Sequence, residues 1–147
     1  MKVRFIKHLR GGGDRDAERV YRWHIDRRRY ANAKIGLGMD SKGSTDNYVA
    51  AAYQLCASMG NAGFIARFAI PVDVDGVLLD GSHRLACAIV YGIDAIPVIT
   101  YRGRRAHAPP WDFEWFFSKG MPRDDLVQTV SDLVALIDTR RHQDPVK

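Results

Sequence analysis

The chain has 147 residues, of which 46% are hydrophobic and 27% are charged, and these proportions are ordinary for a globular protein. This length predicts one domain, residues 1–147, and the formal net charge of +5 favours anionic partners such as nucleotides, phosphorylated molecules or nucleic acid. Its apolar runs are shorter than the roughly 20 residues of a membrane span, and no secretory signal pattern is evident, so we expect a cytoplasmic protein without a membrane partner.

The first third of the chain is strongly basic. Residues 1–9 alternate roughly between apolar and polar side chains, which predicts a strand that ends at the glycine run 11–13. The segment 14–30 has apolar residues at helical spacing and predicts a helix, followed by a glycine-containing loop over 31–43. Basic and aromatic side chains in this region suit a nucleic acid, but a solvated helix face is the favoured interpretation.

A second helix is predicted over 46–59, because its apolar residues recur on one face. Asp46 lies at its start, where it serves either as a helix cap or as a site residue that faces the central part of the chain. Cys56 and Cys87 both stand in apolar helical contexts, so we expect two buried free thiols rather than a disulfide.

The central stretch, 70–101, concentrates polar residues between apolar runs. It predicts a strand to residue 74, a hairpin turn at Asp75-Gly76, a strand at 77–79, a helix over 85–91 ended by Gly92, and a strand over 96–101. After this stretch come an aromatic cluster and an amphipathic helix over 124–140. The cluster suits base stacking, but packing on the core is favoured; it comprises Trp111, Phe113, Trp115, Phe116 and Phe117.

The corner Asp80-Gly81-Ser82-His83-Arg84 leads from the strand at 77–79 into the next helix. The first turn of a helix has backbone N–H groups without intrahelical partners, so anions bind there readily. Gly81 permits a sharp turn and close approach, Ser82 offers a hydroxyl, and His83 and Arg84 suit phosphate. The alternative is that Asp80 or Ser82 caps the helix while His83 and Arg84 are solvated.

The segments 74–88, Tyr91-Gly-Ile93 and Ile96-Pro-Val98 resemble the core of the ParB/sulfiredoxin-like superfamily. The resemblance implies a single α/β (α+β) domain with a small mixed sheet, packed helices and a C-terminal amphipathic helix. Its core is then about 44–101, with an aromatic-rich extension over 107–141. Sulfiredoxins have a catalytic cysteine where this chain has Ser82, and a hydroxyl cannot perform that thiol chemistry.

Members of this superfamily bind nucleotides at the corresponding corner, and the Asp-Gly-x-His-Arg form is closest to the kinase-like branch. The resemblance therefore implies a phosphotransferase, or a nucleotide hydrolase, that uses ATP or ADP with Mg²⁺, and CTP is a further candidate. Its second substrate is an unknown small-molecule acceptor. The alternative is a ParB-like module that binds CTP and nucleic acid without phosphotransfer.

On this hypothesis Gly81, Ser82, His83 and Arg84 hold the nucleotide, and Arg84 offsets the charge that builds up during transfer. His83 and Arg84 are also counted as catalytic. Asp80 fixes the corner or binds the metal that the nucleotide carries, and no separate metal-ligand set is evident. A general base has to be a carboxylate, for which Asp46 and Asp73 are the candidates.

Overall fold

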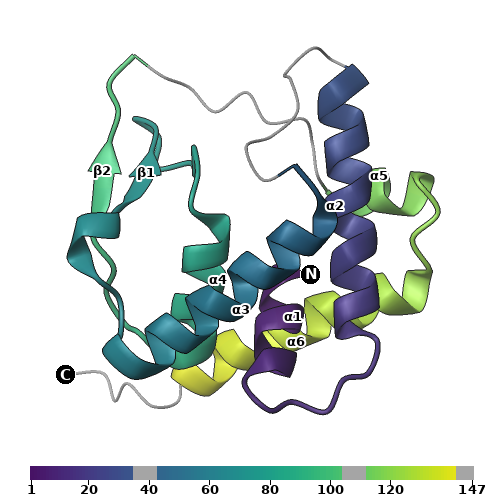
Figure 1. The fold of residues 1–147 in the computed structure, drawn as a ribbon, viewed down its shortest axis with the longest axis horizontal. Helices are drawn as coiled ribbons and strands as arrows, with labels where there is room; N and C mark the ends of the chain where they lie inside the picture. Colours follow the sequence, from purple (N-terminus) through teal and green to yellow (C-terminus); the bar gives the residue numbers. More distant parts are fainter. Residues whose placement is uncertain (35–42, 104–111, 142–147) are drawn as a thin grey trace.

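A computed structural model describes residues 1–34, 43–103 and 112–141. It is a small α/β domain, mostly helical, with one two-stranded parallel sheet (Figure 1). The elements in chain order are α1 Lys2–Leu9, α2 Ala17–Lys34, α3 Thr45–Ala62, the 3₁₀ helix η1 Ala66–Phe68, β1 Ile70–Val72, α4 Ser82–Tyr91, β2 Val98–Thr100, α5 Phe113–Ser118 and α6 Arg123–Arg141. Every described helix is too short or too polar to cross a lipid bilayer.

Helix α1 lies among the other helices and contacts α2, α3, α4 and α6 (Figure 1). The prediction of a strand at residues 1–9 was therefore wrong. Three consecutive residues, Arg4, Phe5 and Ile6, are buried, which requires partners on more than one side of the segment. A half-buried strand would alternate between buried and exposed positions instead.

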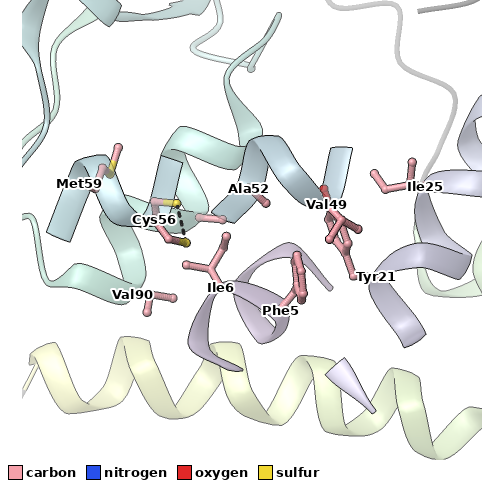
Figure 2. Packing of buried hydrophobic residues seen from close by; sticks show 11 residues of the cluster. Phe5, Ile6, Tyr21, Ile25, Val49, Ala52, Cys56, Met59 and Val90 are labelled. Atoms are coloured by element: carbon pink, nitrogen blue, oxygen red, sulfur yellow. Dashed lines mark hydrogen bonds between the residues drawn. The ribbon is translucent and has the colours of Figure 1, made fainter. Parts of the chain in front are cut away.

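The main core forms where α1, α2, α3 and α4 meet (Figure 2). The Phe5 ring stacks on the Tyr21 ring, with their centroids 4.2 Å apart. Cys56 and Cys87 are buried free thiols whose sulfur atoms lie 3.8 Å apart, so that prediction is confirmed. The buried members of this core are Phe5, Ile6, Tyr21, Ile25, Val49, Ala52, Cys56, Met59, Ala86, Cys87 and Val90.

The predicted helices of the first half are confirmed with small shifts in their ends. Helix α2 continues to Lys34, so it includes the start of the predicted loop, and residues 35–42 of that loop lie outside the described residues. Helix α3 begins after Ser44, whose side chain accepts a hydrogen bond from the backbone N–H of Asn47. The cap of α3 is thus Ser44 rather than Asp46, and the helix ends at Gly63.

The sheet is smaller than the sequence suggested. Strands β1 and β2 pair in parallel, with Ile70 opposite Val98, and α4 connects them. The hairpin turn is confirmed: Gly76 has φ +79°, and the N–H of Asp73 donates to the Val77 carbonyl. The strand at 77–79 was wrong, since this segment forms only an isolated antiparallel bridge, between Leu78 and Val72.

Helices α4 and α6 confirm the two remaining helix predictions. Helix α4 starts at Ser82 and ends at Gly92, which has the expected left-handed conformation with φ +72°. The predicted apolar stripe of α6 comprises Leu126, Val130, Leu133 and Ile137, but only Leu126 is buried. The other three residues are between 36% and 51% exposed, so this stripe does not pack as a complete core face.

The aromatic cluster packs on the protein only in part. Phe116 is buried in a second, smaller core with Val20, Met121 and Leu126, and Trp115 packs against it. Phe113 and Phe117 are 43% and 56% exposed, and Trp111 lies outside the described residues. The core interpretation therefore holds for the part of the cluster around Phe116.

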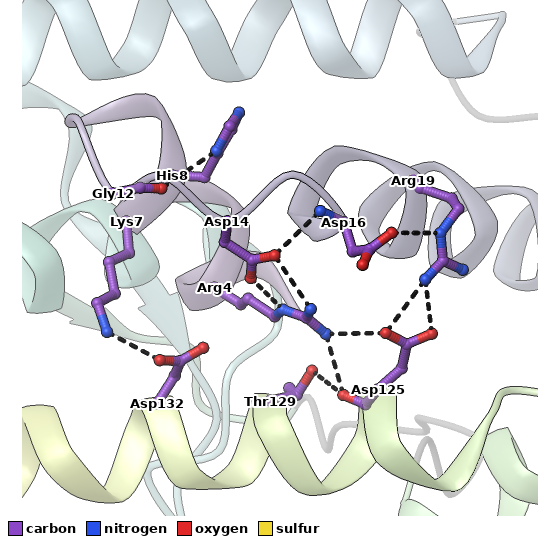
Figure 3. Close-up of polar contacts among 10 residues, drawn as sticks. All are labelled: Arg4, Lys7, His8, Gly12, Asp14, Asp16, Arg19, Asp125, Thr129 and Asp132. Carbon is purple, nitrogen blue, oxygen red and sulfur yellow. Dashed lines mark hydrogen bonds and ion pairs between the residues drawn. The ribbon is translucent and has the colours of Figure 1, made fainter.

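A buried arginine joins the N-terminal segment to the last helix (Figure 3). Arg4 is 5% exposed, and its guanidinium lies 2.6 Å from the Asp14 carboxylate and 3.2 Å from that of Asp125. Arg19, on α2, also binds Asp125, at 3.0 Å. Because the hydrogen bond from Arg4 lowers the pKa of Asp14, this acid is ionised at neutral pH.

Replacing Arg4 by methionine keeps most of the side-chain volume and removes the charge. We expect Arg4→Met to lower the free energy of unfolding by about 3 kcal/mol or more, because the buried Asp125 loses a cation. Urea denaturation measures this difference. The control is Arg19→Met, which removes a 54% exposed partner of the same acid and should cost about 1 kcal/mol at most. Equal costs for both variants would contradict a special role for Arg4.

Candidate functional site

A cavity of about 580 Å³ extends along α4 from its first turn. Residues of α1, α2, α4, α5 and α6 line it, together with the segment 78–80 that enters the corner. Its volume lies in the range of small-molecule sites, which is roughly 300–1,000 Å³. The polar lining residues are Lys2, His24, Arg28, Asp80, Ser82, Asp112 and Thr129.

The polar part of this lining contains two cations, Lys2 and Arg28, and two carboxylates, Asp80 and Asp112. Lys2 reaches from α1 to the start of α4, where its ammonium group donates to the Ser82 hydroxyl at 2.5 Å. Arg28 lines the cavity from α2. Gly81 is the N-cap of α4, has the left-handed conformation and, as a glycine, offers no side chain to cap the helix. The positive end of α4 therefore adds to the charges of Lys2 and Arg28, an arrangement suited to an anion.

His24 lines the cavity from α2 and is 6% exposed. Burial lowers its pKa well below the ordinary value of 6.5, and the positive charges of Lys2 and Arg28 lower it further, so the ring is neutral. Among the described residues, its Nδ1 atom has no hydrogen-bond partner. A buried polar atom of this kind calls for an explanation, and a ligand that hydrogen-bonds to it is one.

The structure brings Asp80 and Ser82 to the cavity, but His83 and Arg84 make their contacts elsewhere. The His83 Nε2 atom lies 2.6 Å from the Tyr21 hydroxyl, within reach of a hydrogen bond. The Arg84 guanidinium donates to the backbone carbonyls of Phe68 and, at 3.1 Å, of Ala69. Neither residue is among the described residues that line the cavity. Arg84 therefore fixes the chain before β1 against α4.

The position of the Arg84 side chain also requires a glycine at residue 81. Its φ of +83° is unfavourable for other residues, and a Cβ atom there would lie 2.9 Å from the Arg84 Nη2 atom. The close approach that glycine permits is thus made by Arg84, which also lies 3.7 Å from the Asp80 carboxylate. The predicted corner is present, but its Arg84 side chain binds other groups of the protein: the Asp80 carboxylate and the Phe68 and Ala69 carbonyls.

The two predicted general bases lie outside the described lining of the cavity. Asp46 is paired with Arg22 at 2.5 Å, and its side chain is 81% exposed. Asp73 is buried rather than on the surface, and one of its carboxylate oxygens accepts hydrogen bonds from the N–H groups of Asp75 and Val77, at 2.9 and 2.8 Å. Asp73 therefore shapes the hairpin turn, and the carboxylates among the described lining residues are Asp80 and Asp112.

Sequence reasoning missed Lys2, His24 and Arg28. Lys2 was placed on a predicted strand, and Arg28 was included in a basic run interpreted as a solvated face. A usable signal was present: His24 and Arg28 are four residues apart on one helix, so they share a face. Nothing local, however, indicates that this face meets the start of α4.

Three other arginines of α2 are engaged in contacts with the protein. Arg19 binds Asp16 and Asp125, Arg22 binds Glu18 and Asp46, and Arg29 donates to the Gly43 carbonyl. These contacts fit the interpretation of a solvated, ion-paired helix face. They leave less free charge for the phosphates of a nucleic acid.

Within the described ranges, no three His, Cys, Asp or Glu side chains are grouped as a metal site would require. Comparisons of the chain with protein-family models, curated proteins and solved structures gave no match. The case for a function therefore depends on the cavity and on the sequence resemblance.

His24 predicts how stability depends on pH. The unfolded chain takes up a proton near the ordinary pKa of 6.5, whereas the folded chain does so only at much lower pH. The free energy of unfolding should therefore fall as the pH drops below that value, by up to about 1.4 kcal/mol per pH unit. Urea denaturation between about pH 6.5 and pH 4.5 measures this slope. His24→Leu should show a shallower slope, and equal slopes would show that His24 titrates normally.

Proposed function

We propose that the chain binds a nucleotide, ATP or ADP with Mg²⁺, at the cavity beside Asp80-Gly81-Ser82, and that it is a kinase-like phosphotransferase. The observation that carries this proposal is the start of α4, where the N-cap residue is Gly81 and Ser82 lines a cavity together with Lys2 and Arg28. The resemblance to the nucleotide-binding corner of the ParB/sulfiredoxin-like superfamily supports it.

On this proposal the phosphates lie against the first-turn N–H groups of α4 and the Ser82 hydroxyl. Lys2 and Arg28 supply the positive charge that was expected from His83 and Arg84. Arg84 keeps a role in the site, since it holds the corner in place through the Phe68 and Ala69 carbonyls. A helix start, a hydroxyl and two cations are a donor set that suits phosphate.

The carboxylates of the cavity fit the remaining requirements of phosphotransfer. A nucleotide-borne Mg²⁺ needs only one or two protein carboxylates, and it would neutralise phosphate charge. Asp80 and Asp112 are the lining carboxylates, and the Asp112 side chain also caps α5. Asp80 replaces Asp46 and Asp73 as the candidate that accepts the proton of an acceptor hydroxyl.

Calorimetric titration with ATP, ADP and CTP in the presence of Mg²⁺ tests this proposal. We expect at least one nucleotide to bind with micromolar affinity, and Lys2→Ala to weaken binding about tenfold or more, because a charged hydrogen-bond donor is lost. The matched control is Lys7→Ala on the same helix, since Lys7 pairs with Asp132 at 2.8 Å and is not among the described lining residues.

Two outcomes would contradict the proposal. If no nucleotide binds, the proposal is wrong. If wild type and Lys2→Ala bind the nucleotide with equal affinity, the nucleotide site does not include Lys2. Binding to nucleic acid that weakens steeply with salt, without transfer or release of phosphate, would favour the ParB-like module instead. Lys2 is a better test than Arg84, because Arg84→Ala releases backbone carbonyls near β1 and so disturbs the fold.

A further inference from the structure

The walls of the cavity away from its charged residues are hydrocarbon. Leu85 and Ile89 contribute from α4, and Leu126, Val130 and Leu133 contribute from α6. The α6 positions follow the spacing of one helix face, so together they form a largely apolar wall in which Thr129 is the polar member. Phosphate groups gain nothing from such a wall, and a ligand that fills the cavity therefore needs an apolar part.

His24 is a polar lining residue that lies beside an aromatic one. Its ring is 5.4 Å from the Phe116 ring, measured between centroids, and the Phe116 ring also lines the cavity. The pKa shift keeps the imidazole neutral, so Nδ1 either donates or accepts one hydrogen bond, depending on the tautomer. A hydroxyl or phosphate oxygen at the end of an apolar ligand satisfies that atom.

We propose that the acceptor of the phosphoryl group is an apolar alcohol, aliphatic or aromatic, whose body lies against α4 and α6 and whose hydroxyl reaches Lys2, His24 and Ser82. The transfer step rests on the proposed function. In that step the acceptor oxygen forms a bond to the terminal phosphorus of ATP, and the bond from this phosphorus to the leaving oxygen of ADP breaks. The hydroxyl proton passes to the Asp80 carboxylate, and the product is an apolar phosphate monoester.

Alkyl phosphates, which have the form of the proposed product, test the ligand class directly. Calorimetry should show that affinity increases from inorganic phosphate through ethyl and butyl to hexyl phosphate. The expected increase is about fourfold for each methylene group, which corresponds to about 0.8 kcal/mol of burial. A series in which inorganic phosphate and hexyl phosphate bind equally would overturn the inference.

Two valines on α6 provide a matched pair of variants. Val130 and Val134 are 51% and 48% exposed, and of the two only Val130 is among the described residues that line the cavity. Val130→Asp should reduce the gain per methylene group, whereas Val134→Asp should leave the series unchanged. His24→Leu should weaken the binding of every member of the series, because each carries a phosphate oxygen. An equal effect of both valine variants would show that the apolar body lies elsewhere.

The same titrations separate this inference from the proposed function. If the alkyl series rises while ATP, ADP and CTP fail to bind, the amphipathic ligand class stands and the phosphotransferase proposal falls. If a nucleotide binds while the alkyl series is flat, the nucleotide site stands and the apolar acceptor is excluded. Production of hexyl phosphate from hexanol and ATP would support both proposals together.

Discussion

The buried guanidinium of Arg4 is the constraint on which the rest of the structure depends. It holds α1 against both Asp14, before α2, and Asp125, on α6. With α1 fixed in this way, Phe5 stacks on Tyr21, and the Tyr21 hydroxyl lies 2.6 Å from His83 at the start of α4. Removing one partner of a buried ion pair leaves the other charge uncompensated, so Arg4 holds in place the helix from which Lys2 reaches Ser82.

The proposed site is a consequence of that arrangement. Lys2 comes from the first turn of α1, His24 and Arg28 from α2, and Ser82 from α4, so these polar side chains reach one cavity only when three helices are correctly packed. Burial of His24 among cations costs stability when the pH falls, since the folded protein resists protonation of the ring. Shifted pKa values of this kind cluster at functional sites, and His24 combines its shift with a position on the cavity wall.

The sequence predicted the parts of this fold that local rules determine. Periodicity and caps located α3, α4 and α6, and the left-handed Gly92 and the Asp75-Gly76 turn followed from residue preference. The segment 1–9 failed because Val3, Phe5 and Ile6 favour strands, while the burial that makes it a helix comes from distant elements. Similarly, Arg84 suits phosphate in sequence, but tertiary packing directs it to the carbonyls of Phe68 and Ala69.

Helix α6 shows why a helical apolar pattern alone cannot distinguish a core from a binding site. Its stripe was correctly recognised at Leu126, Val130 and Leu133, and in the structure all three residues line the cavity. Leu126 is buried, whereas Val130 and Leu133 are partly exposed, because a cavity wall lacks the opposite layer of side chains that a core supplies. The same helix uses Asp125 to hold Arg4, so one element both anchors α1 and forms the apolar wall beside Lys2. The Arg4–Asp125 ion pair therefore joins the helix that carries Lys2 to the helix that carries the apolar wall.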